Sequence, residues 1–148
     1  MIRPAELKDV PGIINLGQRI HWASAFKSRP YRPERVAQRS VQYINRDDYT
    51  ILLAEYQGLI VGIIPAWISD SAFTFDRIAC EEVIYVQPEY RRFRYGIQLI
   101  RAYINWAKSQ GANDIRIGNI GGMTDDEQYN RLLSRLGFTR TGGMYVMR

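Results

Sequence analysis

The chain has 148 residues, of which 46% are hydrophobic, so one domain spanning residues 1–148 can bury a full core. Its net charge of +5 suits an anionic ligand, a nucleic acid or an acidic surface, and it does not choose among them. The single cysteine, Cys80, excludes an internal disulfide and a multi-cysteine metal site, and we expect no metal centre.

The first ten residues lack the apolar stretch of a secretory signal. The longest apolar run, residues 59–68, contains Pro65 and is too short to cross a bilayer. These features predict a soluble cytoplasmic protein without a membrane partner.

The N-terminal third predicts a strand and two helices. A strand over residues 1–3 precedes a helix over about 7–18, whose beginning is marked by Asp9 and Pro11. Residues 23–35 contain two prolines and no apolar periodicity, which indicates a loop of the kind that often borders a substrate site. A second helix is expected near residues 33–45.

The middle of the chain predicts three strands and a long helix. Residues 49–56 and 59–69 are rich in β-branched and aromatic residues and flank Gln57-Gly58, which is typical of a two-residue hairpin turn. A strand over residues 78–86 and an amphipathic helix over 95–110, ended by Gly111, follow.

The last third predicts a parallel strand over residues 114–119, a helix over 124–136, and a closing hairpin made of residues 138–141 and 144–147. The strand over 78–86, the following helix and the strand over 114–119 form a parallel crossover unit. Ligands favour the carboxyl edge of such strands.

That edge carries a cationic turn. Arg91, Arg92 and Arg94 lie just before the helix that is expected to begin at Tyr95. Backbone amides at a helix N-terminus have no intrahelical partner and lie at the positive end of the helix dipole, so the turn predicts a phosphate-binding site.

The pattern of this turn resembles a known family. Val86, Pro88, Tyr90, Arg91, Gly96 and Leu99, together with the ending Leu136-Gly137-Phe138, resemble the coenzyme A loop and last helix of GNAT-type N-acetyltransferases. The order of elements is also similar to the whole GNAT fold, and residues 111–122 resemble a subgroup found in bacteria and bacteriophages.

The resemblance implies a GNAT-like α/β (α+β) single domain, with a mixed sheet of six to seven strands flanked by about four helices. It implies acetyl-CoA as cosubstrate, with the amides of residues 92–97 around the pyrophosphate. The cofactor-binding residues implied are Tyr85, Val86, Arg91, Arg92, Phe93, Arg94, Tyr95, Gly96, Ile97 and Asn119.

Two positions depart from the family pattern. Arg94 occupies the first glycine position of the loop, where its side chain either clamps a phosphate or obstructs close approach. Leu133 occupies the position where many relatives carry the tyrosine that protonates the leaving thiolate, and Tyr129, one turn earlier, is the candidate substitute. A packing role for Tyr129 is the alternative.

Two adjacent glutamates are the candidates for a general base. An alkylamine with a pKa of about 10.4 is protonated at neutral pH and must lose a proton before it attacks a thioester. Strand alternation places Cys80, Glu82, Ile84 and Val86 on one face and Glu81, Val83 and Tyr85 on the other. The family resemblance selects Glu82, with Glu81 as the second candidate, and ion pairing with arginines is the alternative for both.

The family resemblance also implies that a backbone amide at Tyr85 or Val86 stabilises the thioester oxyanion. The leading hypothesis is direct transfer of an acetyl group to an unidentified amine, in a small molecule or a protein. Two other classes stay open: a GNAT-fold sensor or scaffold that binds CoA without turnover, and a nucleic-acid binder in which Tyr90, Phe93 and Tyr95 stack on bases. A homodimer also stays open.

Overall fold

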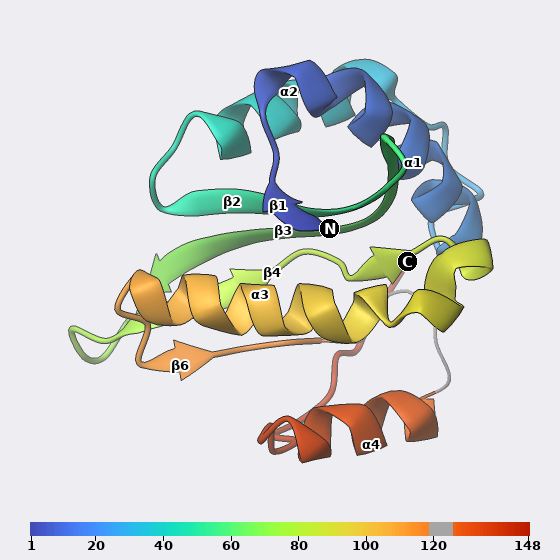
Figure 1. Ribbon diagram of the computed structural model, residues 1–148. Coiled ribbons are helices and arrows are strands. Elements are labelled where there is room, and N and C mark those ends of the chain that lie inside the picture. Colours follow the sequence, from blue (N-terminus) through green and yellow to red (C-terminus); the bar gives the residue numbers. More distant parts are fainter. Residues whose placement is uncertain (119–125) are drawn as a thin grey trace.

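The computed structural model describes residues 1–118 and 126–148. Six strands of the described residues form one mixed sheet in the order β1-β2-β3-β4-β6, with β5 pairing beside β4 on β3 (Figure 1). All neighbours are antiparallel except β4 and β6. The strands are β1 (Ile2–Pro4), β2 (Tyr49–Tyr56), β3 (Leu59–Asp70), β4 (Arg77–Glu81), β5 (Tyr85–Val86) and β6 (Asp114–Ile115).

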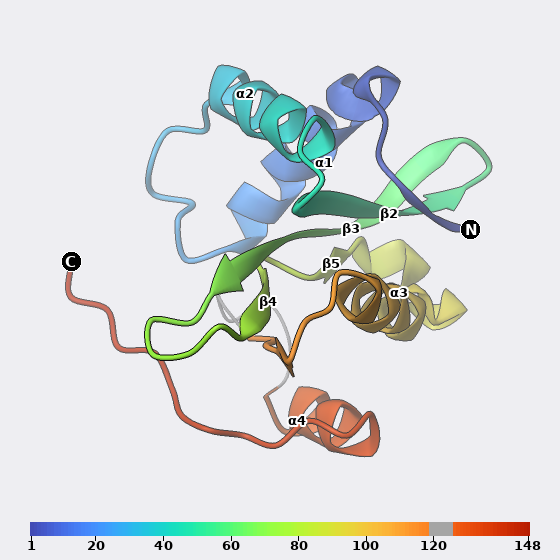
Figure 2. The same cartoon turned by 90° about the vertical axis from the view of Figure 1, so that its left-hand side faces the viewer.

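Helices cover both faces of the sheet. Figure 2 shows α1 and α2 on one face and α3 and α4 on the other. Each side has its own apolar core, centred on Leu16 and Leu53 for the first and on Leu99 and Tyr103 for the second. The α-helices are α1 (Val10–Ala23), α2 (Pro33–Ile44), α3 (Tyr95–Ser109) and α4 (Asp126–Arg135), and 3-10 turns span Leu7–Asp9 and Pro88–Phe93. This arrangement confirms the predicted fold class.

The hairpin between β2 and β3 was predicted correctly. Gln57 and Gly58 both have positive φ angles, 49° and 79°, as a type I′ turn requires. The turn aligns Tyr56 with Leu59 and so fixes the register of the two central strands.

The strand predicted over residues 78–86 is broken into β4 and β5. β4 ends with Glu81 opposite Ala66, and β5 begins with Tyr85 opposite Ile63, so three residues lie opposite two on β3. The break coincides with Pro65, whose carbonyl accepts a hydrogen bond from the Glu82 amide at 2.9 Å. Since Pro65 has no N–H to donate on that side, the ladder cannot continue, and a bulge forms.

The bulge corrects the predicted alternation of side chains. Across it the period of two is shifted by one residue, so Ala79 packs in the same core as Val86, and Tyr85 packs in the other. Glu82 therefore lies on the α1–α2 side of the sheet, apart from Val86, and Glu81 lies on the α3–α4 side.

β6 is shorter than predicted because it diverges from β4. The last main-chain bond between the two chains joins the Arg116 amide to the Ala79 carbonyl at 2.9 Å. The next groups bind side chains instead: the Gly118 amide donates to Glu81 Oε1 at 2.7 Å, and the Arg116 carbonyl accepts from the Tyr103 hydroxyl at 2.6 Å. The two strands are thus open toward their carboxyl ends.

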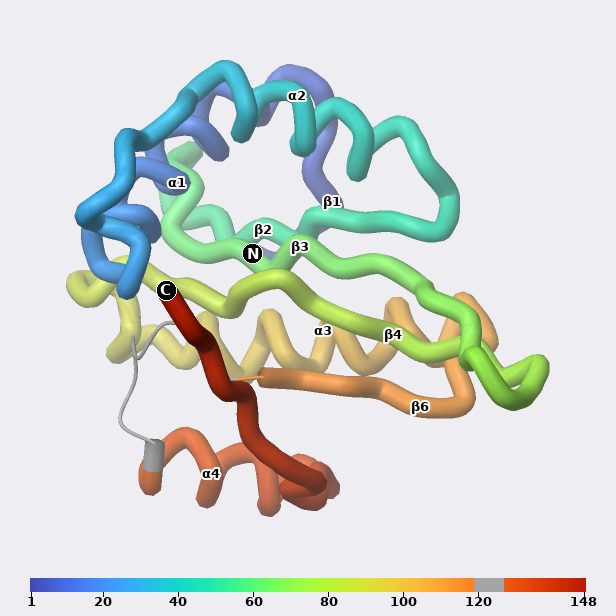
Figure 3. Tube along the Cα trace, turned by 180° about the vertical axis from the view of Figure 1, so that it is seen from behind, coloured from blue at the N-terminus to red at the C-terminus, as the bar shows by residue number. Residues whose placement is uncertain are grey.

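The predicted C-terminal hairpin is wrong. Residues 138–148 form no strand, and Figure 3 shows them leaving α4 as a coil. A strand needs the edge of another strand, and the terminal strand β6 offers only two residues. Tyr145 and Met147 are accordingly exposed.

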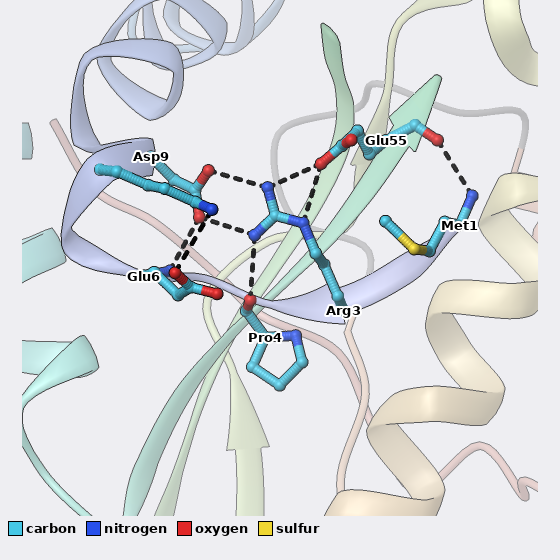
Figure 4. A network of polar contacts seen from close by, with 7 residues as sticks. Met1, Arg3, Pro4, Glu6, Asp9 and Glu55 are labelled. Atoms are coloured by element: carbon cyan, nitrogen blue, oxygen red, sulfur yellow. Dashed lines mark hydrogen bonds and ion pairs between the residues drawn. The ribbon is translucent and has the colours of Figure 1, made fainter. Parts of the chain in front are cut away.

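A polar network fixes the N-terminal strand (Figure 4). Arg3 binds both carboxylate oxygens of Asp9, at 2.7 and 2.8 Å, and also pairs with Glu55 on β2. Asp9 accepts the Glu6 amide as well, which closes the 3-10 turn before α1. The predicted first helix therefore begins with this turn and extends further, to Ala23. Within the described residues, no helix is both long and apolar enough to span a membrane.

Candidate active site

The cationic turn precedes α3 as predicted. The first α-helical bond runs from the Gln98 amide to the Arg94 carbonyl at 3.2 Å, so the amides of Tyr95, Gly96 and Ile97 precede it. Arg94, the N-cap residue, makes no side-chain capping bond. These three amides and the helix dipole together form a site suited to an anion.

Arg94 has a left-handed backbone, with φ 61° and ψ 18°. The family pattern has glycine at this position, and glycine adopts this conformation without steric cost, whereas an L-residue pays about 1 kcal/mol. Arg94 thus reproduces the glycine backbone at some cost, and its exposed side chain is added at the mouth of the turn.

Gly96 provides the test of whether a phosphate group fits. A Cβ added at Gly96 would have no protein atom within 4 Å, and the residue has ordinary helical backbone. Neither the packing nor the conformation of the protein demands glycine here, although glycine weakens a helix. The open space over the free amides therefore fits a diphosphate that approaches the backbone closely.

Aromatic rings hold the turn against the sheet. Phe93 stacks on Tyr56 of β2 at 5.4 Å between ring centroids, and Tyr90 contacts both rings. Arg91 Nε donates to the Val86 carbonyl at 3.0 Å. Tyr95 is only 7% exposed. The rings proposed for base stacking in the nucleic-acid hypothesis are thus engaged with one another and with the core.

A cleft of about 560 Å³ lies on the other face of the sheet, bordered by α1, the connection between α1 and α2, and α2. We call it the α1–α2 cleft. The predicted loop over residues 23–35 borders it through Phe26, Pro30 and Tyr31, and Ile51, Ile63 and Val83 lie on its sheet side. Its size and mainly apolar lining suit a small organic molecule.

Glu82 lines this cleft. Its carboxylate accepts hydrogen bonds from Arg39 Nη2 at 3.0 Å and from the Tyr43 hydroxyl at 3.1 Å, both on Oε2. Oε1 has no hydrogen-bond partner among the described residues, and the side chain is 44% exposed. The carboxylate is therefore held in place through one oxygen while the other is available to accept a proton.

Glu81 has a different environment. It is 8% exposed and accepts only the Gly118 amide among the described residues. Burial raises the pKa of Glu81 from 4.5 to about 7; the Gly118 hydrogen bond opposes this rise and the charge of Glu82 adds to it. Glu81 therefore bridges the diverging strands and does not line the α1–α2 cleft.

Tyr129 and Leu133 lie on the side of α4 that packs toward the sheet. The Tyr129 hydroxyl donates to the Gly118 carbonyl at 2.9 Å, and Leu133 packs against the apolar core. Burial, and after it the charge of Glu81, raises the pKa of the Tyr129 hydroxyl above its ordinary value. The hydroxyl therefore keeps its proton at neutral pH.

The pairing of β5 with β3 distinguishes the two predicted oxyanion donors. The Gln87 amide donates to the Val61 carbonyl at 2.8 Å, and Val86 lies opposite Gly62. Since amides alternate in direction along an antiparallel strand, the amide of Tyr85 faces β3 and that of Val86 faces away from it. Arg91 Nε bonds to the Val86 carbonyl, which agrees with this direction.

The structure thus brings the turn residues 91–97 together and places Glu82, Glu81 and Tyr129 in three separate surroundings. Asn119 lies outside the described residues. Sequence reasoning missed Arg39 and Tyr43, which hold Glu82 from α2. It also missed that Arg32, Arg35 and Arg39, at helical spacing, all line the α1–α2 cleft; that spacing was a usable signal.

Comparison with known proteins agrees with this geometry. Residues 17–138 match the model of the acetyltransferase (GNAT) family. No curated protein sequence matches the chain at a significant level.

Solved structures share the fold over the whole chain at low sequence identity. Glucosamine-6-phosphate N-acetyltransferase from Arabidopsis thaliana has a TM-score of 0.79 at 16% identity, covering 100% of this chain and 97% of that one. Ribosomal-protein-alanine N-acetyltransferase from Brucella melitensis biovar Abortus has a TM-score of 0.73 at 18% identity, covering 100% and 97%. AAC(6')-Iy in complex with a CoA bisubstrate analog has a TM-score of 0.77 at 18% identity, covering 100% and 96%.

Proposed function

Because the chain belongs to the GNAT family of acetyltransferases, we propose that it transfers the acetyl group of acetyl-CoA to an amine bound in the α1–α2 cleft. One observation carries the proposal. The free oxygen of Glu82 lies in that cleft, at the bulge that leads directly into β5 and the anion-binding turn. A base and an acetyl donor site are thereby joined by one short segment of chain.

The acetyl donor is held by main-chain groups. The amides of Tyr95, Gly96 and Ile97 bind the diphosphate, and Arg92 and Arg94 add charge at the same place. The pantetheine arm lies where β4 and β6 diverge, a gap that Glu81 spans through the Gly118 amide. AAC(6')-Iy has been solved in complex with CoA, which supports this use of the shared fold.

The chemical step needs three groups of this chain. Glu82 accepts the proton of the amine, directly or through a water, so that the nitrogen lone pair can form a bond to the carbonyl carbon. The Val86 amide donates to the carbonyl oxygen as negative charge develops there. When the carbon–sulfur bond breaks, the thiolate takes a proton, and we propose Tyr129 as its donor after release from the Gly118 carbonyl.

Replacing Glu82 tests the assignment. We expect Glu82→Gln to lower the turnover number by about a hundredfold, in the range typical of a lost general base, while the Kd for acetyl-CoA stays unchanged. Turnover is measured by release of the CoA thiol with a panel of amines, and the Kd by calorimetry. Glu34→Gln, an exposed glutamate of α2 outside the cleft, is the matched control. Unchanged turnover in Glu82→Gln would remove Glu82 from this role.

The position of Leu133 favours a second candidate, a sensor or scaffold that binds acetyl-CoA without turnover. Leu133 carries no proton donor, and the hydroxyl of Tyr129 is engaged with the Gly118 carbonyl. Calorimetric binding of acetyl-CoA without thiol release, with every class of amine tested, would favour the sensor. Release that falls in Tyr129→Phe would favour the enzyme and identify the proton donor.

A further inference from the structure

The walls of the α1–α2 cleft are mainly apolar, and its charged groups are unbalanced. Of the described residues, three arginines line it (Arg32, Arg35 and Arg39), and Glu82 is its single carboxylate. Arg39 is paired with Glu82 at 3.0 Å. Arg35 binds the neutral amide oxygen of Gln38 at 2.9 Å. Two cations, Arg32 and Arg35, therefore remain without a carboxylate partner among the described residues.

These cations lie at a defined distance from the base. Arg32, Arg35 and Arg39 follow one another at helical spacing along α2, so their backbones lie on one side of that helix. With a rise of 1.5 Å per residue, Arg35 lies about 6 Å and Arg32 about 10 Å along the axis from Arg39, which holds Glu82. A ligand whose amine meets Glu82 can thus reach both free guanidinium groups with the far end of an apolar body.

Such a cleft also selects against some amines. A polycation would bring further positive charges toward Arg32 and Arg35 in a partly apolar space, where like charges repel more strongly than in water. This separates the chain from AAC(6')-Iy, whose structure holds an acetylneamine analog, although the fold is shared.

We propose that the acceptor is a primary amine on an apolar or aromatic body that carries an oxyanion group, carboxylate or phosphate, roughly 6 to 10 Å from the nitrogen. The anionic group binds Arg32 and Arg35, the apolar body fills the cleft, and the amine meets Glu82. This inference rests on the proposed function, because the acetyl donor defines which end of the ligand reacts.

A matched series of amines tests the proposal. Phenethylamine, tyramine phosphate and para-carboxyphenethylamine share one aromatic body and differ in charge, and spermidine represents the polycations. We expect kcat/KM for the two anionic amines to exceed that for phenethylamine at least tenfold, and spermidine to react most slowly. The two anionic arms distinguish a phosphate from a carboxylate acceptor.

The double variant Arg32→Gln/Arg35→Gln should reduce this preference to about twofold or less. Arg29→Gln is the matched control, since Arg29 is exposed in the same connection and does not line the cleft. It should keep the preference. Turnover that is equal or faster with phenethylamine or spermidine, or a preference that survives the double variant, would overturn the inference and leave the proposed function standing.

Absence of turnover with every amine would count against the proposed function, and equilibrium binding then decides the acceptor class. Calorimetry in the presence of CoA should show at least tenfold tighter binding of para-carboxyphenethylamine than of phenethylamine, and the double variant should lose that difference. Equal binding of the two amines would overturn the inference.

Discussion

Glu81 is predicted to make the stability of the protein depend on pH. Burial moves its pKa from 4.5 to about 7, and a tenfold change in proton affinity corresponds to about 1.4 kcal/mol. Ionising Glu81 therefore costs about 3 kcal/mol more in the folded protein than in the unfolded chain. The folded protein holds the proton more tightly, so this contribution to stability is complete below about pH 4.5 and is lost as the pH rises through about 7.

The variant Glu81→Gln removes the ionisation and keeps an oxygen that can accept the Gly118 amide. We expect its free energy of unfolding, relative to that of the wild type, to increase by about 2 kcal/mol between pH 5 and pH 8. Urea denaturation at the two pH values measures this difference, with the slope against urea concentration checked for constancy.

Glu34→Gln serves as the control, because it removes a carboxylate from the exposed side of α2, where burial does not penalise the charge. Its difference from the wild type should be the same at both pH values. A difference between Glu81→Gln and the wild type that does not change with pH would refute the assignment of Glu81 to a buried, charge-poor environment.

Three further predictions concern the anion-binding turn and the N-terminal network. Arg94→Gly should raise the free energy of unfolding by about 0.5 to 1 kcal/mol, because the left-handed backbone suits glycine, and should weaken CoA binding severalfold at low salt if the side chain clamps a phosphate; unchanged affinity would indicate that it does not. Gly96→Ala should stabilise the protein alone by up to about 1 kcal/mol yet weaken CoA binding at least tenfold, and Gly96→Val should abolish it; wild-type affinity in calorimetry would show that the diphosphate binds elsewhere. Asp9→Asn should destabilise the protein by about 1 to 2 kcal/mol at neutral pH; since the Arg3 hydrogen bond lowers the pKa of Asp9 to about 2, the difference from wild type in urea should persist above about pH 4 and disappear as the pH falls through 2.

Local patterns were sufficient for most of the fold. The hairpin followed from Gln57-Gly58, and α3 followed from its apolar spacing and from Gly111, which has a φ of 74° just beyond its end. The C-terminal hairpin failed because strand propensity does not reveal whether a partner edge exists. The break between β4 and β5 was also missed, although Pro65 was visible within the apolar run.

The site could be predicted only in part for the same reason. The turn over residues 91–97 is contiguous, so its sequence identified it. The partners of Glu82 come from α2, 39 and 43 residues away, and no local pattern shows which helix face meets which strand. The left-handed backbone of Arg94 was hidden because the residue itself disfavours that conformation, and only the family's glycine at this position pointed to it.

The two adjacent glutamates show how a single bulge organises the site. In a regular strand, neighbouring side chains point to opposite faces, and the residues that follow keep that alternation. Here the missing N–H of Pro65 interrupts the ladder just after Glu81, so the strand turns over by one residue before Tyr85. Glu82 thereby enters the α1–α2 cleft, where Arg39 stabilises its charge, while Glu81 is left in the opposite core, where burial disfavours its charge and the Gly118 amide is its partner. A substitution that restores a donor on β3, such as Pro65→Val, should therefore favour a regular strand, and hydrogen exchange should show greater protection of the amides of residues 82–84 together with loss of the Glu82 contact to Arg39. Unchanged protection would mean that the bulge has another cause.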